Sequence, residues 1–219
     1  MPSDAQLEIR CFATGVFQQN TWLVREKAGG TTLLFDAGDG IADLLRKPGV
    51  LVNGRLDAVL LTHTHMDHVW GLAALKRAFP SAPVHAHEGE LPLLRSLARQ
   101  GAMIGFPAEI EAAPDPDVLV APGARLRFGG IEAAAIHTPG HTPGGLCWLL
   151  NNRHLFAGDM VFAGSVGRTD LPGGNPSAMV DSLRRLLELD DAVVIYSGHG
   201  PETTIGEERA ENPYLQGLA

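Results

Sequence analysis

Four side chains that commonly bind metal ions lie within six residues of one another: His63, His65, Asp67 and His68. The apolar stretch at residues 56–61 precedes them and is typical of a strand buried on both faces. Without a cation, three imidazoles and a carboxylate at a strand end would repel one another or be poorly solvated. Neutral imidazole and carboxylate are usual ligands of divalent metals. The spacing therefore predicts a metal site at the end of this strand.

Three further candidates stand downstream in glycine-rich turns: His141, Asp159 and His199. The turns of Asp159 and His199 follow expected strands, and the turn of His141 precedes one. Glycine lets the backbone bend sharply and approach closely, so that strand-end side chains can be directed at a common centre. We therefore interpret these residues as candidates for the same metal site.

With these residues the chain resembles the metallo-β-lactamase superfamily, and within it the short glyoxalase II-like thioester hydrolases. The family motif HxHxDH is matched at residues 63–68, and the later ligand positions are matched at His141, Asp159 and His199. Further matches lie at residues 36–38, 164–170 and 197–204. The resemblance covers nearly the whole chain.

This resemblance implies an α/β fold, a four-layer αββα sandwich with its metals at one edge of the sheets. It also implies two divalent metal ions, with zinc expected first and with iron and manganese as alternatives, since all three accept mixed nitrogen and oxygen ligands. The implied ligands are His63, His65 and His141 for one ion and Asp67, His68 and His199 for the other, with Asp159 bridging them. In an extended segment, residues two apart project to the same side, which suits His63 and His65.

Two such ions can share a water and lower its pKa towards about 7, giving a hydroxide that attacks an acyl carbonyl. Asp67 would act catalytically by orienting this nucleophile or accepting its proton. A thiolate leaves with little acid assistance, because a thiol pKa is only about 8.5. The expected reaction is thioester hydrolysis, with a 2-hydroxyacyl-glutathione such as S-lactoylglutathione as the first substrate to test. Arg168 would contact a substrate carboxylate through its guanidinium or only brace its loop.

Three other functions remain open. Persulfide dioxygenases share this fold and a similar Gly-Arg-Thr-Asp loop, here residues 167–170, but use one iron. Lactone hydrolysis is a second alternative, and a non-catalytic metal-binding protein is a third that the complete ligand set disfavours. Full glyoxalase II enzymes carry a C-terminal helical domain that contacts glutathione, whereas this chain stops 20 residues after His199, so recognition of glutathione is an open question.

Composition narrows the possible partners. The 219 residues suit one domain over residues 1–219, and the net charge of −8 argues against a nucleic-acid surface. No apolar run reaches the roughly 20 residues that span a bilayer, and residues 1–6 lack the features of a signal peptide. We therefore expect a cytoplasmic enzyme that acts on a small-molecule thioester without nucleic acid or membrane. The two cysteines, Cys11 and Cys147, are expected to be free, buried and non-catalytic.

The expected elements alternate strands and helices in both halves of the chain. Strands are predicted at residues 7–12, 21–24, 31–35, 56–61, 83–86, 118–120, 125–128, 131–137, 146–150, 153–156 and 192–196. Helices are predicted at 41–47, 69–79, 89–100, 176–189 and 205–212, with Asp67 near the start of the second. Residues 101–116 and 163–174 read as irregular segments. The remaining histidines expected to be structural or exposed are His85, His87, His137 and His154.

Overall fold

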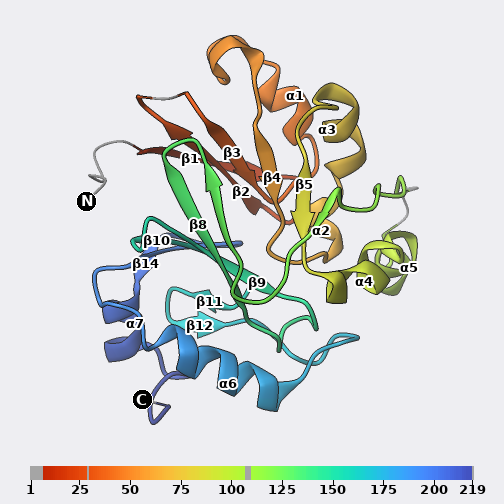
Figure 1. Cartoon of the computed structure of the whole chain (residues 1–219). Coiled ribbons are helices and arrows are strands. Elements are labelled where there is room, and N and C mark those ends of the chain that lie inside the picture. Colours follow the sequence, from red (N-terminus) through yellow and green to blue (C-terminus); the bar gives the residue numbers. More distant parts are fainter. Residues whose placement is uncertain (1–6, 29, 107–109, 219) are drawn as a thin grey trace.

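A computed structural model describes residues 7–28, 30–106 and 110–218. Two six-stranded sheets form its centre (Figure 1). In spatial order, the first contains β1 (Leu7–Thr14), β2 (Gln19–Glu26), β3 (Thr32–Phe35), β4 (Ala58–Leu60), β5 (Val84–Ala86) and β6 (Val118–Leu119). Strands β1 to β3 are antiparallel, and β3 to β6 are parallel. The parallel strands end on the same edge, from which the predicted HxHxDH segment leaves.

The second sheet supplies the other ligand-bearing turns. In spatial order it contains β14 (Thr203–Thr204), β13 (Val194–Ser197), β10 (His154–Gly158), β9 (Leu146–Leu150), β8 (Ile131–His137) and β7 (Arg125–Phe128). All neighbours are antiparallel except β10 and β13, which run parallel. A separate small hairpin pairs β11 (Val161–Phe162) with β12 (Ser165–Val166), and β12 lies inside the segment 163–174 predicted to be irregular.

The fold has four layers, helices, sheet, sheet and helices, and a hydrophobic cluster lies between each pair of adjacent layers. The outer face of the first sheet packs against α1 (Ile41–Leu45) and α3 (Leu72–Ala78), and the outer face of the second packs against α6 (Pro176–Leu186) and α7 (Ile205–Glu211). Between the sheets, apolar side chains such as Phe35, Trp148 and Phe156 interdigitate. Strands buried on both faces carry the continuous apolar runs seen in the sequence. The predicted four-layer αββα fold is confirmed.

Two predicted helices are each divided. The helix predicted at 69–79 is α2 (Met66–Val69) followed by α3, and Gly71 lies at the break. Gly71 N–H donates to the carbonyl of Ala37 at 2.8 Å, and a Cβ on Gly71 would lie 2.2 Å from the carbonyl oxygen of Gly38. The chain bends there because a neighbouring loop approaches closely, which no local pattern reveals.

The helix predicted at 89–100 is also divided. It consists of the 3₁₀ turn η3 (Glu88–Glu90), α4 (Leu91–Leu94) and α5 (Leu97–Met103). The Ser96 hydroxyl donates to the carbonyl of Leu93 at 2.8 Å, which favours a break between α4 and α5. Helix α5 therefore extends into the segment 101–116 predicted to be irregular. Another 3₁₀ turn, η2 (Val52–Gly54), precedes β4.

The cysteines and the lengths of the helices can also be compared with the predictions. Cys11 and Cys147 are free as predicted, but Cys11 is exposed, because its strand β1 lies at the edge of the first sheet. In the described ranges, the helices are all too short or too polar to cross a bilayer. Residues 1–6, where the sequence lacks the features of a signal peptide, and residues 107–109 of the segment predicted to be irregular lie outside the described residues.

Candidate metal centre

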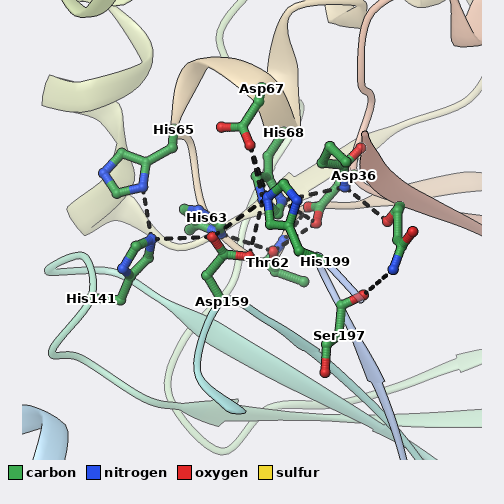
Figure 2. Close-up of polar contacts among 12 residues, drawn as sticks. Asp36, Thr62, His63, His65, Asp67, His68, His141, Asp159, Ser197 and His199 are labelled. Atoms are coloured by element: carbon green, nitrogen blue, oxygen red, sulfur yellow. Dashed lines mark hydrogen bonds and ion pairs between the residues drawn. The ribbon is translucent and has the colours of Figure 1, made fainter. Parts of the chain in front are cut away.

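The first cluster contains His63, His65 and His141, whose ligand atoms lie within 4.8 Å of one another. His63 and His65 follow β4, and His141 lies between β8 and β9, so both sheets contribute (Figure 2). Nδ1 of His65 lies 2.8 Å from Nε2 of His141, and the rings of His63 and His141 have centroids 4.8 Å apart. Three imidazoles that converge in this way are the ligand set predicted for the first ion.

The second cluster contains Asp67, His68 and His199. Asp67 and His68 lie in the first turn of α2, and His199 follows β13. Nε2 of His199 lies 3.1 Å from Oδ2 of Asp67, and Nε2 of His68 lies 3.7 Å from the same oxygen. The structure thus brings together the ligands predicted for the second ion.

Asp159 lies between the two clusters (Figure 2). Its Oδ1 is 3.2 Å from Nε2 of His68, and its Oδ2 is 3.6 Å from Nε2 of His141 and 3.8 Å from Nε2 of His199. It also forms a metal-compatible group with His63 and His68. One carboxylate therefore faces both clusters, which is the arrangement required of a bridging ligand.

The chemistry of these donors fits metal ions. Among the described residues, the buried atoms Nε2 of His63, Nε2 of His68 and Oδ1 of Asp159 have no hydrogen bond partner, although the last two form an ion pair at 3.2 Å. A buried polar atom without a partner costs roughly 1–3 kcal/mol, so such atoms are rare unless a ligand or ion satisfies them. Imidazole nitrogen and carboxylate oxygen are suitable donors to zinc, iron and manganese. The residues present therefore fit two divalent ions.

Buried hydrogen bonds orient the ligands from behind. His68 Nδ1 donates to Asp36 at 2.8 Å, and Asp36 also accepts from the backbone N–H of Thr62 at 2.7 Å. His141 Nδ1 donates to the carbonyl of Arg168 at 2.7 Å. In both histidines Nδ1 is occupied and Nε2 is left to face the cluster, as is common for metal-binding histidines.

Glu90 is a buried carboxylate that sequence reasoning missed. It is 1% exposed and accepts from the backbone N–H and hydroxyl of Thr64 at 2.7 and 2.9 Å. Its other oxygen accepts from the backbone N–H of Gly144 at 2.9 Å. Thr64 separates His63 from His65, and Gly144 belongs to the turn of His141, so Glu90 connects both parts of the first cluster. No motif marks it, because its partners lie 26 and 54 positions away.

Close backbone packing positions His199. The side-chain amide of Asn20 donates to the carbonyls of Ser197 and Gly200 at 3.2 and 2.8 Å. A Cβ on Gly198 would lie 2.2 Å from Oδ1 of Asp159 and 2.5 Å from Cε1 of His68. The glycine predicted to permit a sharp turn is thus also needed for space beside two ligands.

The electrostatics favour metal-binding protonation states for several ligands. Burial, followed by neighbouring imidazoles, lowers the pKa of His63 and lowers that of His65 to about 3. Burial opposes ionisation of Asp67 and Asp159, but surrounding histidines, with His68 foremost, hold the pKa of both carboxyls below the ordinary value. Both carboxylates are therefore ionised, and His63 and His65 are neutral, at neutral pH.

His68 and His199 behave differently. Burial alone would lower the pKa of each imidazole, but the carboxylates around them, chiefly Asp159 and Asp67, raise it above the usual value. A proton on these rings partly compensates the two negative charges in the metal-free chain. A metal ion would have to displace that proton, because only neutral imidazole coordinates.

The other predicted site residue, Arg168, is engaged locally. Its guanidinium forms two hydrogen bonds of 2.6 Å with the carboxylate of Asp170, and both side chains are exposed. Contact between this guanidinium and a substrate stays a prediction. The four remaining histidines lie outside every metal-compatible group of the described residues: His85, His87, His137 and His154.

Comparison with known proteins identifies the family of this chain. The family model described as metallo-beta-lactamase superfamily matches residues 14–199, which include all seven candidate ligands. The hydroxyacylglutathione hydrolase GloC of Haemophilus influenzae is 33% identical over 211 residues, which cover 95% of this chain and 98% of that protein.

Two solved structures are similar along almost their entire length. The crystal structure of the BLEG-1 B3 metallo-beta-lactamase has a TM-score of 0.86 and 32% identity, and covers 96% of this chain and 100% of that chain. The crystal structure of TTHA1623 in a di-iron-bound form has a TM-score of 0.83 and 37% identity, and covers 94% of this chain and 100% of that chain.

Proposed function

Because this chain belongs to the metallo-β-lactamase superfamily, we propose that it is a metal-dependent hydrolase that cleaves thioesters. The first substrates to test are 2-hydroxyacyl-glutathiones such as S-lactoylglutathione. The observation that carries the proposal is the pair of three-ligand clusters joined by Asp159. The similarity to a hydroxyacylglutathione hydrolase supports the choice of thioester.

The proposed roles divide between holding metal and moving a proton. One ion would be held by His63, His65 and His141, the other by Asp67, His68 and His199, and both by Asp159. When bound, the ions would lower the pKa of a water and polarise the substrate carbonyl. Asp67 is ionised, and its Oδ2 lies 3.1 Å from Nε2 of His199 within the second cluster, so its carboxylate would accept the proton of that water.

The reaction needs no oxidant or reductant. The water oxygen bonds to the carbonyl carbon, the carbon–sulfur bond breaks, and sulfur leaves with the electron pair as a thiolate. The products are a carboxylic acid and a thiol. Since an unperturbed thiol has a pKa of about 8.5, a thiolate departs without a strong acid, whereas the nitrogen of a β-lactam or the oxygen of a lactone depends more on protonation.

Metal content and activity together test the proposal. We expect purified protein reconstituted with zinc, iron or manganese to hold two ions per chain and to release thiol from S-lactoylglutathione. The same preparation should be assayed with a lactone, a β-lactam and glutathione persulfide. Oxygen uptake with sulfite formation from the persulfide, by protein holding a single iron, would replace the proposal with the dioxygenase.

The Asp67→Ala variant tests the proton acceptor. We expect it to lower kcat by about 100-fold or more, the usual range for a general base, and to weaken the second cluster. Asp43→Ala is the matched control, because Asp43 is an exposed aspartate in the first turn of α1. Normal turnover by folded, metal-loaded Asp67→Ala protein would remove Asp67 from the mechanism.

A further inference from the structure

A cleft of about 570 Å³ opens beside the candidate metal centre. His65, Asp67, His141 and Asp159 form part of its lining. Much of the rest comes from α4, α5 and the loop at residues 168–173, with further contributions from the β1–β2 turn, η3 and the β8–β9 turn. In Figure 1, α4 and α5 lie next to each other beside α2, which carries Asp67. Its volume suits a small molecule, and its position would place part of a bound substrate beside the ligand clusters.

The walls of this cleft are largely apolar. Phe17, Met66, Leu93, Met103 and Ile104 line it. Three of them, Phe17, Met103 and Ile104, are among the eight large hydrophobic side chains that are exposed in the described ranges. Single exposed apolar residues are ordinary, but apolar residues that converge on one cleft indicate a binding site.

Most polar side chains on the lining are already used within the protein. Gln100 accepts from the backbone N–H of Met66 and donates to the carbonyls of Thr64 and Leu93. Ser96 donates to Leu93 as well. The guanidinium of Arg168 is held by Asp170. These groups have little capacity left to bind polar parts of a ligand.

Arg99 is the exception. Its side chain is exposed and lines the cleft, and within the described part of the chain no acidic side chain lies in ion-pair contact with it. A guanidinium offers a planar set of five N–H donors, which suits a carboxylate. Outside the metal cluster, the described lining of the cleft thus presents apolar walls and the guanidinium of Arg99, which is available to bind an anion.

We propose that the cleft selects thioesters that carry a bulky apolar group and a single anionic group, and that Arg99 binds the anion. This inference rests on the proposed thioester hydrolysis and narrows its substrate class. Glutathione is a poorer match, because its tripeptide has two carboxylates, an ammonium and two amides, and the cleft has few free polar partners for them. The apolar group lies either on the acyl side or on the thiol side of the sulfur.

Binding of thioethers, which cannot be hydrolysed, tests the cleft separately from catalysis. We would measure hexylthioacetic acid, methylthioacetic acid and hexylthioacetamide by calorimetry with metal-loaded protein. Each buried methylene adds about fourfold in affinity, so the hexyl acid should bind at least about tenfold more tightly than the methyl acid. It should also bind about tenfold more tightly than the neutral amide, since hydrogen bonds to charged groups are the stronger ones.

Variants with matched controls test which residue contacts the carboxylate and which contacts the hexyl chain. Arg99→Gln should remove the preference for the acid over the amide, and Arg99→Lys should keep part of it. Arg95→Gln is the control, because Arg95 is exposed nearby but pairs with Asp115 and does not line the cleft. Met103→Ser should reduce the ratio of hexyl to methyl affinity about fivefold. Val52→Ser, at an exposed valine outside the cleft, should leave this ratio unchanged.

Two substrate series show whether the apolar group that binds in the cleft lies on the acyl side or on the thiol side of the sulfur. One varies the acyl chain on a fixed thiol, and the other varies the thiol on a fixed lactoyl group. The series in which kcat/KM rises about fourfold for each added methylene marks the group in the cleft.

The outcomes distinguish the proposed selectivity of the cleft from the proposed hydrolysis of thioesters. Equal affinity for the hexyl and methyl acids, or cleavage of thioesters with no rise of kcat/KM in either series, would overturn the apolar selection. Acid binding that is unchanged in Arg99→Gln would place the carboxylate on the metals and overturn the role of Arg99. Tight binding of the hexyl acid by metal-loaded protein that cleaves no thioester would support the cleft and refute thioester hydrolysis.

Discussion

At the level of single residues, hydrogen bonds to two buried carboxylates, Asp36 and Glu90, hold the candidate ligands in position. Asp36 accepts from His68 and from the backbone of Thr62, and Glu90 accepts from Thr64 and Gly144. Each carboxylate is at least 26 positions away in the sequence from the residues that it binds beside the metal clusters. The ligands themselves follow from a motif, but the importance of Glu90 depends on tertiary contacts that a local pattern does not encode.

Glu90→Gln tests this connection. Both oxygens of Glu90 accept from backbone N–H groups, so an amide nitrogen in place of one oxygen would leave a buried donor without an acceptor. We expect a loss of about 1–3 kcal/mol in the free energy of unfolding and weaker metal binding by the first cluster. Chemical denaturation and metal titration measure the two effects. Glu88→Gln is the control, because Glu88 is exposed in the same 3₁₀ turn, and equal behaviour of the two variants would refute the connection.

The two thiols provide an independent test of residue environments. Burial raises the pKa of Cys147 to about 12, whereas Cys11 is exposed. At pH 8 we expect a thiol reagent to modify one cysteine in the folded protein and two after unfolding, and Cys11→Ser to abolish the native reaction. The unfolded thiol ionises near 9.0 and the folded one near 12, so Cys147 also lowers stability as the pH rises between these values. Rapid modification of both thiols in the folded protein would contradict this burial.

At the level of elements, the buried strands were predictable and the helix breaks were not. Strand β4 lies within the predicted strand at 56–61, and its successive residues Val59 and Leu60 pack into different clusters on opposite faces of the sheet, which explains the continuous apolar run. The break at Gly71 results from contact with the loop at Ala37 and Gly38, more than thirty positions earlier. The cleft is also a tertiary feature, since it combines the β1–β2 turn, two short helices and a distant loop.

The turn after β13 gives a prediction at this scale. Gly198→Ala would place a methyl group 2.2 Å from Oδ1 of Asp159, so the turn or the carboxylate must move. We expect metal binding by Asp67, His68 and His199 to weaken by at least about tenfold, as is typical when ligand support is disturbed. Gly200→Ala separates collision from backbone strain, because Gly200 has a φ of 77° but open space around its Cβ position. Similar metal affinities for the two variants would refute the steric explanation.

For the whole molecule, the candidate centre joins the two sheets. His63, His65, Asp67 and His68 follow β4 of the first sheet, whereas His141, Asp159 and His199 come from turns of the second. Ions bound by both sets would crosslink the halves of the sandwich only in the folded state. Binding of this kind stabilises a protein by about 2.7 kcal/mol when the free ligand is at 100 times its Kd.

Removal of metal should therefore lower the melting temperature, and the loss should grow as the pH rises from 6.5 to 8.5. In the metal-free protein the pKa values of His68 and His199 are raised above 6.5, so the stability from their protons is present below the unfolded pKa and is lost as the pH rises through the folded pKa. The lowered pKa values of His63 and His65 act only below 6.5, because both rings are neutral above it. Metal affinity changes in the opposite direction, since fewer protons compete for the ligands as the pH rises. Thermal melts of chelator-treated and reloaded protein across this range measure the difference in melting temperature between the two forms. If this difference stays constant or shrinks as the pH rises, His68 and His199 are not ligands that exchange a proton for metal.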